Sequence, residues 1–133
     1  MADLTGINSI AVEDLARLRA AGIHSTDILL KRCATPAQRQ VLAMSSGISE
    51  EALTSWVNIA DLFRVHGAGA HYVRLMVASG ITSINLLASN SPDELLAKMS
   101  IANVPPKLVR QLPRLTTITE WIAGAKNIAK RVS

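Results

Sequence analysis

Apolar residues recur along this chain at intervals of three and four positions, and short stretches rich in Gly, Pro, Ser and Asn separate the apolar segments. This spacing is typical of amphipathic helices, because residues three and four positions apart lie on one face of a helix. No segment shows the strict alternation of apolar and polar residues that predicts a half-buried strand. The pattern therefore predicts an all-α fold of eight or nine short helices.

Capping sequences mark several helix starts. Segments 35–38 (TPAQ) and 91–94 (SPDE) each place a hydroxyl residue before a proline and put Gln or Glu at the third helical position, which is the pattern of a capping box. Segment 117–120 (TITE) repeats the cap without proline, and Ser49 precedes two acids that the helix dipole favours. We predict helices over residues 11–21, 25–32, 36–45, 50–63, 70–79, 83–88, 92–100, 106–112 and 118–131.

Two parts of the chain have similar sequences at an offset of 58 residues. LRAAGIHSTDILL at 18–30 aligns with MVASGITSINLLA at 76–88, which places Gly22 opposite Gly80. In both parts a proline-containing capping sequence follows the glycine, and a tryptophan follows in a later helix. This shared order indicates an internal duplication of about 60 residues per unit.

The duplication divides the chain into a first unit of residues 1–63 and a second unit of residues 64–133, which we expect to pack as one compact body. Charge differs between them: the first carries five basic and seven acidic residues, and the second carries nine basic and three acidic residues. Attraction to an anionic partner therefore belongs to the second unit. Trp56 and Trp121 occur at similar places in the two units, and we interpret both as core residues rather than as anchors for a partner.

Composition narrows the class of protein. Hydrophobic residues make up 49% of the chain and charged residues 18%, which predicts a folded protein, while the 3% of aromatic residues disfavours a base-stacking platform. No apolar run approaches the roughly 20 residues that span a bilayer, and the acidic N-terminal segment is unlike a signal peptide. We expect a cytoplasmic protein without a membrane partner. The single cysteine, Cys33, allows neither an internal disulfide nor a cysteine-based zinc site.

The segment RVHGAGAHYVRLMVASGI at 64–81 has two glycines, Gly67 and Gly69, directly before a helical pattern that Gly80 ends. Residues without a side chain allow a tight turn, and the free amides of the turn and of the following helix start suit a phosphate oxygen. The alternative is structural: the two glycines allow two helices to cross closely, and Gly80 caps the second helix.

Segment 65–87 resembles the helix-hairpin-helix motif, in which a Gly-hydrophobic-Gly turn holds the DNA backbone without reading its sequence. Gly67, Ala68 and Gly69 correspond to the turn. The match departs from the usual motif at Ala68, where a larger aliphatic residue is common, and at His66, where a small residue or proline is common.

The first unit departs further from the motif. At the 58-residue offset, Ser9 and Ala11 replace the two hairpin glycines, and Glu13 and Asp14 stand in the first turn of the next helix. Because these acids would repel a phosphate, we expect an anion site in the second unit alone.

Over nearly its full length the chain resembles a small bacterial family known as a domain of unknown function, built from two helix-hairpin-helix-like units. AAGIHSTDILL, WVNIADLFRV and WIAGAKNI carry the likeness. The resemblance implies the fold and the tandem arrangement, and it implies no activity.

The sequence offers no signature of catalysis: it has no nucleophile and base at a recognisable spacing, and no phosphate-loop lysine. His66 and His71 are five residues apart without an intervening carboxylate, which does not match a metal-binding pair. We expect neither an enzyme nor a cofactor or metal.

The favoured function is a non-catalytic module that binds a nucleic-acid backbone, with DNA expected first, without sequence specificity and through the second hairpin. The expected contacts are Arg64, His66, Gly67, Ala68, Gly69, Ala70, His71, Arg74, Lys107 and Arg110. The turn would offer its amides, and the basic side chains would add salt-dependent affinity. The alternative function is a protein-interaction adaptor that uses the same fold without binding nucleic acid.

Overall fold

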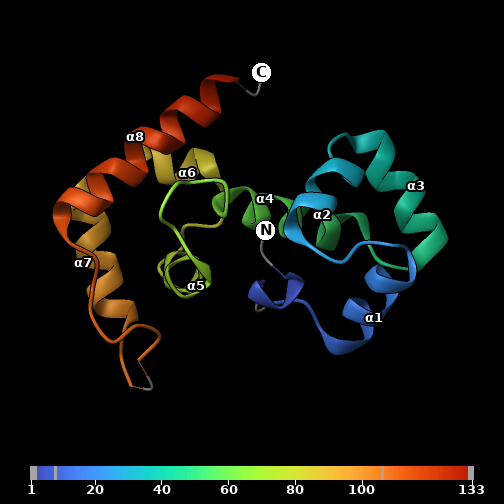
Figure 1. Ribbon diagram of the computed structural model, residues 1–133, viewed down its shortest axis with the longest axis horizontal. Coiled ribbons are helices and arrows are strands. Elements are labelled where there is room, and N and C mark those ends of the chain that lie inside the picture. The colour runs from blue at the N-terminus through green and yellow to red at the C-terminus, as the bar shows by residue number, and fades with distance from the viewer. Residues whose placement is uncertain (1–2, 8, 106, 132–133) are drawn as a thin grey trace. The chain divides into compact units, whose positions relative to one another are not determined.

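The computed structural model describes residues 3–7, 9–105 and 107–131, with the side chains of 129–131 left out as well. The predicted all-α class is confirmed, because every named element in the described ranges is helical and their only β feature is an isolated bridge between Asp3 and Ser25 (Figure 1). The elements are η1 (Leu4–Gly6), α1 (Val12–Ala20), α2 (Thr26–Arg32), α3 (Pro36–Ser46), α4 (Glu50–Leu62), α5 (Ala70–Ala78), α6 (Ile84–Ser89), α7 (Pro92–Ala102) and α8 (Leu115–Arg131). In the described part of the chain, no helix is both long and apolar enough to cross a bilayer.

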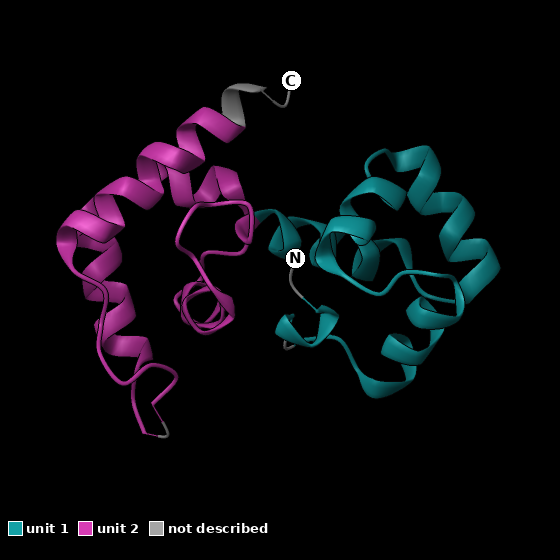
Figure 2. Cartoon of the chain, in the orientation of Figure 1, with its two compact units in different colours: residues 1–61 teal, residues 62–133 magenta. Residues whose placement is uncertain are grey.

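The chain forms two compact units, residues 1–61 and 62–133, which Figure 2 colours separately. The helices of the first unit pack around a core of completely buried aliphatic side chains, which include Leu4, Leu18, Ile23, Leu29 and Leu53. Burial of such side chains supplies the stability that helices this short lack on their own.

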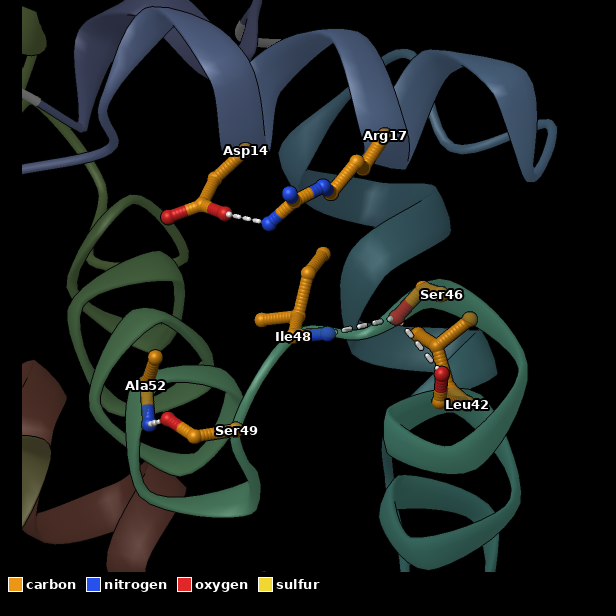
Figure 3. Close-up of polar contacts among 7 residues, drawn as sticks. All are labelled: Asp14, Arg17, Leu42, Ser46, Ile48, Ser49 and Ala52. Carbon is orange, nitrogen blue, oxygen red and sulfur yellow. Dashed lines mark hydrogen bonds and ion pairs between the residues drawn. The ribbon is translucent and has the colours of Figure 1, made fainter.

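The turn from α3 to α4 is held by hydroxyl groups (Figure 3). The Ser46 hydroxyl donates to the Leu42 carbonyl at 2.6 Å and accepts the Ile48 amide at 3.2 Å. The Ser49 hydroxyl then accepts the Ala52 amide at 3.1 Å, which caps the start of α4. The connection between these two helices therefore needs only residues 47–49.

In the second unit, α8 packs against α6 and α7, and α5 packs against α7. The side chains of Val73, Met76, Leu87 and Met99 are completely buried in this core. Trp121 of α8 is 1% exposed, and Trp56 in the first unit is 4% exposed, so the prediction that both tryptophans are core residues is confirmed.

Matching glycines end the first long helix of each unit. Gly22 follows α1 with a φ of 86°, and Gly80 follows α5 with a φ of 89°. In the first unit the Ile23 amide donates to the Leu18 carbonyl at 2.9 Å, and the corresponding bond in the second unit is 2.8 Å. These are Schellman ends, as the helix-terminating role predicted for Gly80 requires.

The predicted caps at Thr35 and Ser91 are confirmed as N-caps. Thr35 forms a complete capping box with Gln38, whereas the Ser91 hydroxyl accepts the Glu94 amide at 3.3 Å. Ser25 and Ser83 cap α2 and α6 in the same way. These side chains satisfy amides that the first turn of a helix leaves without helical partners.

Two of the predicted helix positions are wrong. No helix forms over 107–112, and Pro106, the expected first residue of that helix, lies outside the described residues. Proline disfavours the helical conformation in the residue before it, so Pro105 and Pro113 restrict the backbone at both ends of this short segment. The last helix begins at Leu115 rather than 118, so Thr117 lies inside α8 and does not cap it.

Candidate functional site

The two hairpin glycines serve different purposes. Gly67 is exposed and has a φ of 84°, in the left-handed region that residues with a side chain rarely adopt. A β-carbon added at Gly67 would lie 3.6 Å from Nε1 of Trp121, which is an ordinary contact. The turn therefore requires glycine here because of backbone conformation and not because of close packing.

Gly69 is required by neither its conformation nor its neighbours. Its φ of −87° and ψ of 178° are open to any residue, and no heavy atom lies within 4 Å of the place where a β-carbon would stand. Gly69 is therefore not the site of a close helix crossing, the structural alternative raised by the sequence. It leaves an exposed patch of bare backbone at the start of α5.

Gly69 is also the N-cap of α5, and it has no side chain with which to cap the helix. The first helical bond runs from the Val73 amide to the Gly69 carbonyl at 2.9 Å. The amides of Ala70, His71 and Tyr72 precede that bond, and among the described residues they make no hydrogen bond. This helix start therefore has free donors and the positive end of a dipole.

The Ala68 amide, expected to face a phosphate, already has a hydrogen-bond partner within the chain. This amide donates to the Val65 carbonyl at 3.1 Å, and the side chain of Ala68 is only 7% exposed. The turn uses this amide to close on itself, because the amide points toward Val65 rather than outward. The Ala68 amide is therefore not available to a ligand, and the available backbone amides at the start of α5 come after it.

The basic candidates differ in position. Arg64, His66 and His71 are exposed beside the turn, whereas Arg74 is half-buried in α5. Lys107 and Arg110 are exposed on the connection from α7 to α8. The structure brings Arg110 to the start of α5, where it lines a pocket with His71, and Lys107 is not among the lining residues described.

That pocket has a volume of about 500 Å³ and is lined by His71, Tyr72, Val109, Arg110 and Gln111. His71 and Tyr72 belong to the first turn of α5, and the other three belong to the connection before α8. The sequence pattern did not indicate Tyr72, Val109 or Gln111 as site residues. The available signal was the pair of prolines, Pro105 and Pro113, that flank this segment and disfavour a helix at its ends.

Asn103 holds this connection in place. Its side-chain oxygen accepts the amides of Leu108 and Val109 at 2.9 and 3.1 Å, and its side-chain nitrogen donates to the Val109 carbonyl at 3.1 Å. One side chain thus satisfies three backbone groups that a helix would otherwise have paired. This arrangement positions Arg110 and Gln111 opposite α5.

The corresponding place in the first unit has different chemistry. Ala11 is the N-cap of α1, and Glu13 and Asp14 stand in its first turn. Asp14 pairs with Arg17 at 3.2 Å on the same helix (Figure 3). A phosphate at this helix start would therefore meet two carboxylates.

Among the described residues there is no group of three or more His, Cys, Asp or Glu side chains that could hold a metal ion. Cys33 is buried, and burial raises the pKa of its thiol above the ordinary value, while Arg32 and Arg39 act in the opposite direction. A protonated, buried thiol is a poor nucleophile and a poor metal ligand.

Residues 8–128 match the protein family described as Domain of unknown function (DUF4332). No match was found among curated proteins or among solved structures.

Proposed function

The chain belongs to the DUF4332 family, and we propose that it binds the phosphate backbone of nucleic acid, DNA in the first instance, through the hairpin of the second unit. The single observation that carries this proposal is the open start of α5. There, Gly69 leaves bare backbone on the surface, and the amides of Ala70, His71 and Tyr72 have no partner among the described residues. A phosphate oxygen is the ligand that such a helix start favours.

The proposal includes a tandem of helix-hairpin-helix-like units that arose by duplication. α1 and α5 start at residues 12 and 70, and α2 and α6 start at residues 26 and 84, so both pairs keep the 58-residue offset. In this proposal the first unit has the same hairpin arrangement as the second, but Glu13 and Asp14 at its helix start disfavour binding of a phosphate.

Binding should be independent of base sequence. The hairpin amides and the side chains of Arg64, His66 and His71 suit phosphate oxygens, which are the same at every nucleotide. We expect affinity for duplex DNA to fall with rising salt, with a slope of log K against log salt of about −0.9 for each phosphate neutralised. No binding at low salt would contradict the proposal, and salt-insensitive binding would contradict its mechanism.

Gly69→Asp tests the hairpin directly. Because the position is open and extended, aspartate fits, and it caps α5 and stabilises the helix by a few tenths of a kcal/mol relative to glycine. Its carboxylate occupies the phosphate position, so we expect at least a tenfold loss of affinity for a fluorescent duplex in an anisotropy titration. A stable variant that binds like the wild type would contradict the proposal.

Ala11→Asp is the matched control. Ala11 is the N-cap of α1, and this change adds the same charge at the equivalent place in the first unit. We expect it to raise the free energy of unfolding by about 1 kcal/mol and to change DNA affinity less than twofold.

One observation supports the second candidate function, an adaptor that binds a protein. On α3, Val41 is 69% exposed and Met44 is 88% exposed, and Val41 lines a groove of about 320 Å³. Exposed apolar side chains of this size suit a protein partner. The salt titration separates the two functions: a wild-type chain that does not bind DNA at low salt leaves α3 as the candidate contact.

A further inference from the structure

The pocket beside the hairpin is larger than a phosphate group requires. Its volume of about 500 Å³ falls within the range of about 300–1,000 Å³ for pockets that hold small organic ligands. His71 and Tyr72, which line it, come within three residues of Gly69. A ligand whose phosphate lies at Gly69 therefore has space next to it for a second chemical group.

The lining residues define the chemistry of that group. Tyr72 and Val109 offer apolar surface, and Gln111 offers both a hydrogen-bond donor and an acceptor. Arg110 and His71 add donors for an anion, and no acidic side chain is among the lining residues described. This combination disfavours a cation and suits a flat, polar-edged ring attached to a phosphate.

We propose that this pocket holds the base of one unpaired nucleotide while the phosphate of that nucleotide lies at the hairpin. The inference deepens the proposed function and rests on it. In a closed duplex the bases are paired and stacked, and extracting one costs a few kcal/mol. The protein therefore prefers nucleic acid with an unpaired end or gap over continuous duplex.

The pocket is prepared for this role before the ligand arrives. The three hydrogen bonds of Asn103 hold the backbone of Leu108 and Val109, next to Arg110 and Gln111. On the opposite side, the ring of Tyr72 packs against Trp121, with ring centroids 5.2 Å apart and planes at 56°. Both walls are therefore anchored to the core, which lowers the entropic cost of binding. Asn103 acts here as a positioning residue.

Two DNA probes test the preference. One is a duplex closed at both ends by hairpin loops of a non-nucleotide linker, and the other is the same duplex with one open end that carries a four-nucleotide 3′ overhang. We expect the full chain to bind the overhang probe at least fivefold more tightly in an anisotropy titration. Equal affinity for the two probes overturns the pocket proposal and leaves the backbone-binding function standing, whereas binding to neither overturns both.

Gln111→Ala removes the polar group that faces the base, and Gln40→Ala, at an exposed position of α3, is the matched control. We expect Gln111→Ala to reduce the preference for the overhang below twofold while the closed duplex binds as before. Gln40→Ala should keep the full preference. A Gln111→Ala protein that keeps the full preference overturns the assignment.

Single nucleotides give an independent measurement. In NMR titrations, deoxyadenosine monophosphate should shift the side-chain amide signals of Gln111 and the indole signal of Trp121, whereas equimolar inorganic phosphate should leave the Gln111 amide unmoved. Adenosine monophosphate in a parallel titration distinguishes RNA from DNA as the source, and a response to either nucleotide supports the proposal. An unmoved Gln111 amide with both nucleotides overturns it.

Discussion

In the first unit the Leu15 amide donates to the Ala11 carbonyl at 2.8 Å, and in the second unit the Val73 amide donates to the Gly69 carbonyl at 2.9 Å. Both bonds are the first of a helix, and neither N-cap residue makes a side-chain cap. The backbones are thus hydrogen-bonded alike. What differs is the set of side chains around the helix start.

Glu13 and Asp14 in the first unit correspond to His71 and Tyr72 in the second. The acids compensate the dipole of α1 from within the chain, whereas α5 has no acid in its first turn. The start of α1 thus has its dipole compensated by its own acids, whereas the start of α5 does not; under the proposed function, a phosphate compensates it there.

The connections that follow also differ. Residues 47–49 join α3 to α4, whereas residues 103–114 join α7 to α8. The longer connection carries Arg110 and Gln111 to the hairpin of its own unit. The second unit thus combines two features: α5 starts without a side-chain cap, and the connection before α8 forms one side of a pocket next to that start.

The largest expected effect comes from giving the second hairpin the residues of the first. The double variant Gly69→Ala with His71→Glu should lower duplex affinity at least 30-fold, or about 2 kcal/mol. The added β-carbon obstructs the backbone that a phosphate would approach, and the added carboxylate repels the phosphate. The acid in the first turn should keep α5 stable. Isothermal calorimetry measures the affinity, and circular dichroism checks the fold.

The reciprocal variant, Ala11→Gly with Glu13→His, is the control. It removes only one of the two acids and leaves Asp14 paired with Arg17, so we expect no change in duplex affinity beyond twofold. If this variant lost as much duplex affinity as the variant of the second unit, the proposal that only the second unit binds DNA would be contradicted.

Gly67→Ala should have an intermediate effect, which is a loss of stability and not of affinity. The left-handed backbone at this position costs a residue with a side chain about 1–2 kcal/mol, while the contact with Trp121 adds no clash. Urea denaturation should show that loss in the free energy of unfolding. Ser9→Ala at the corresponding position of the first unit should change it by less than about 0.5 kcal/mol, because no described non-glycine residue has a positive φ.

The smallest effect concerns Cys33, the C-cap of α2, whose counterpart after α6 is Asn90. Burial raises the pKa of the thiol, so the folded state holds its proton at a pH where the unfolded chain loses it. The stabilisation is complete below a pH of about 8.5 and is lost as the pH rises through the folded pKa. In urea denaturation at pH 7 to 10, Cys33→Ala should show a smaller alkaline loss than the wild type; an equal loss would contradict this role.

Much of the fold was predictable because local signals decide it. Hydroxyl caps at Thr35 and Ser91 and glycines at Gly22 and Gly80 act within a few residues of themselves, and these helix ends appear where the pattern places them. The segment around Pro105 was not predictable in this way. Its conformation depends on Asn103, whose bonds reach six residues along the chain and replace a helix.

The site was predictable only in part. The glycine pattern identified the hairpin, but it could not show that Ala68 spends its amide on Val65 or that Gly69 alone stays open. The pocket needs residues about 40 positions apart, from Tyr72 to Gln111, to meet. The periodicity of apolar residues does not predict this contact, because the contact depends on how the helices pack.

The contact between Tyr72 and Trp121 makes the order of synthesis matter. The ring that supports Tyr72 belongs to α8 and is translated 49 residues after Tyr72. A nascent chain that stops before α8 therefore has a hairpin without a finished pocket beside it. Under the proposed function, the binding surface is complete only after α8 has been translated and has packed against α6 and α7.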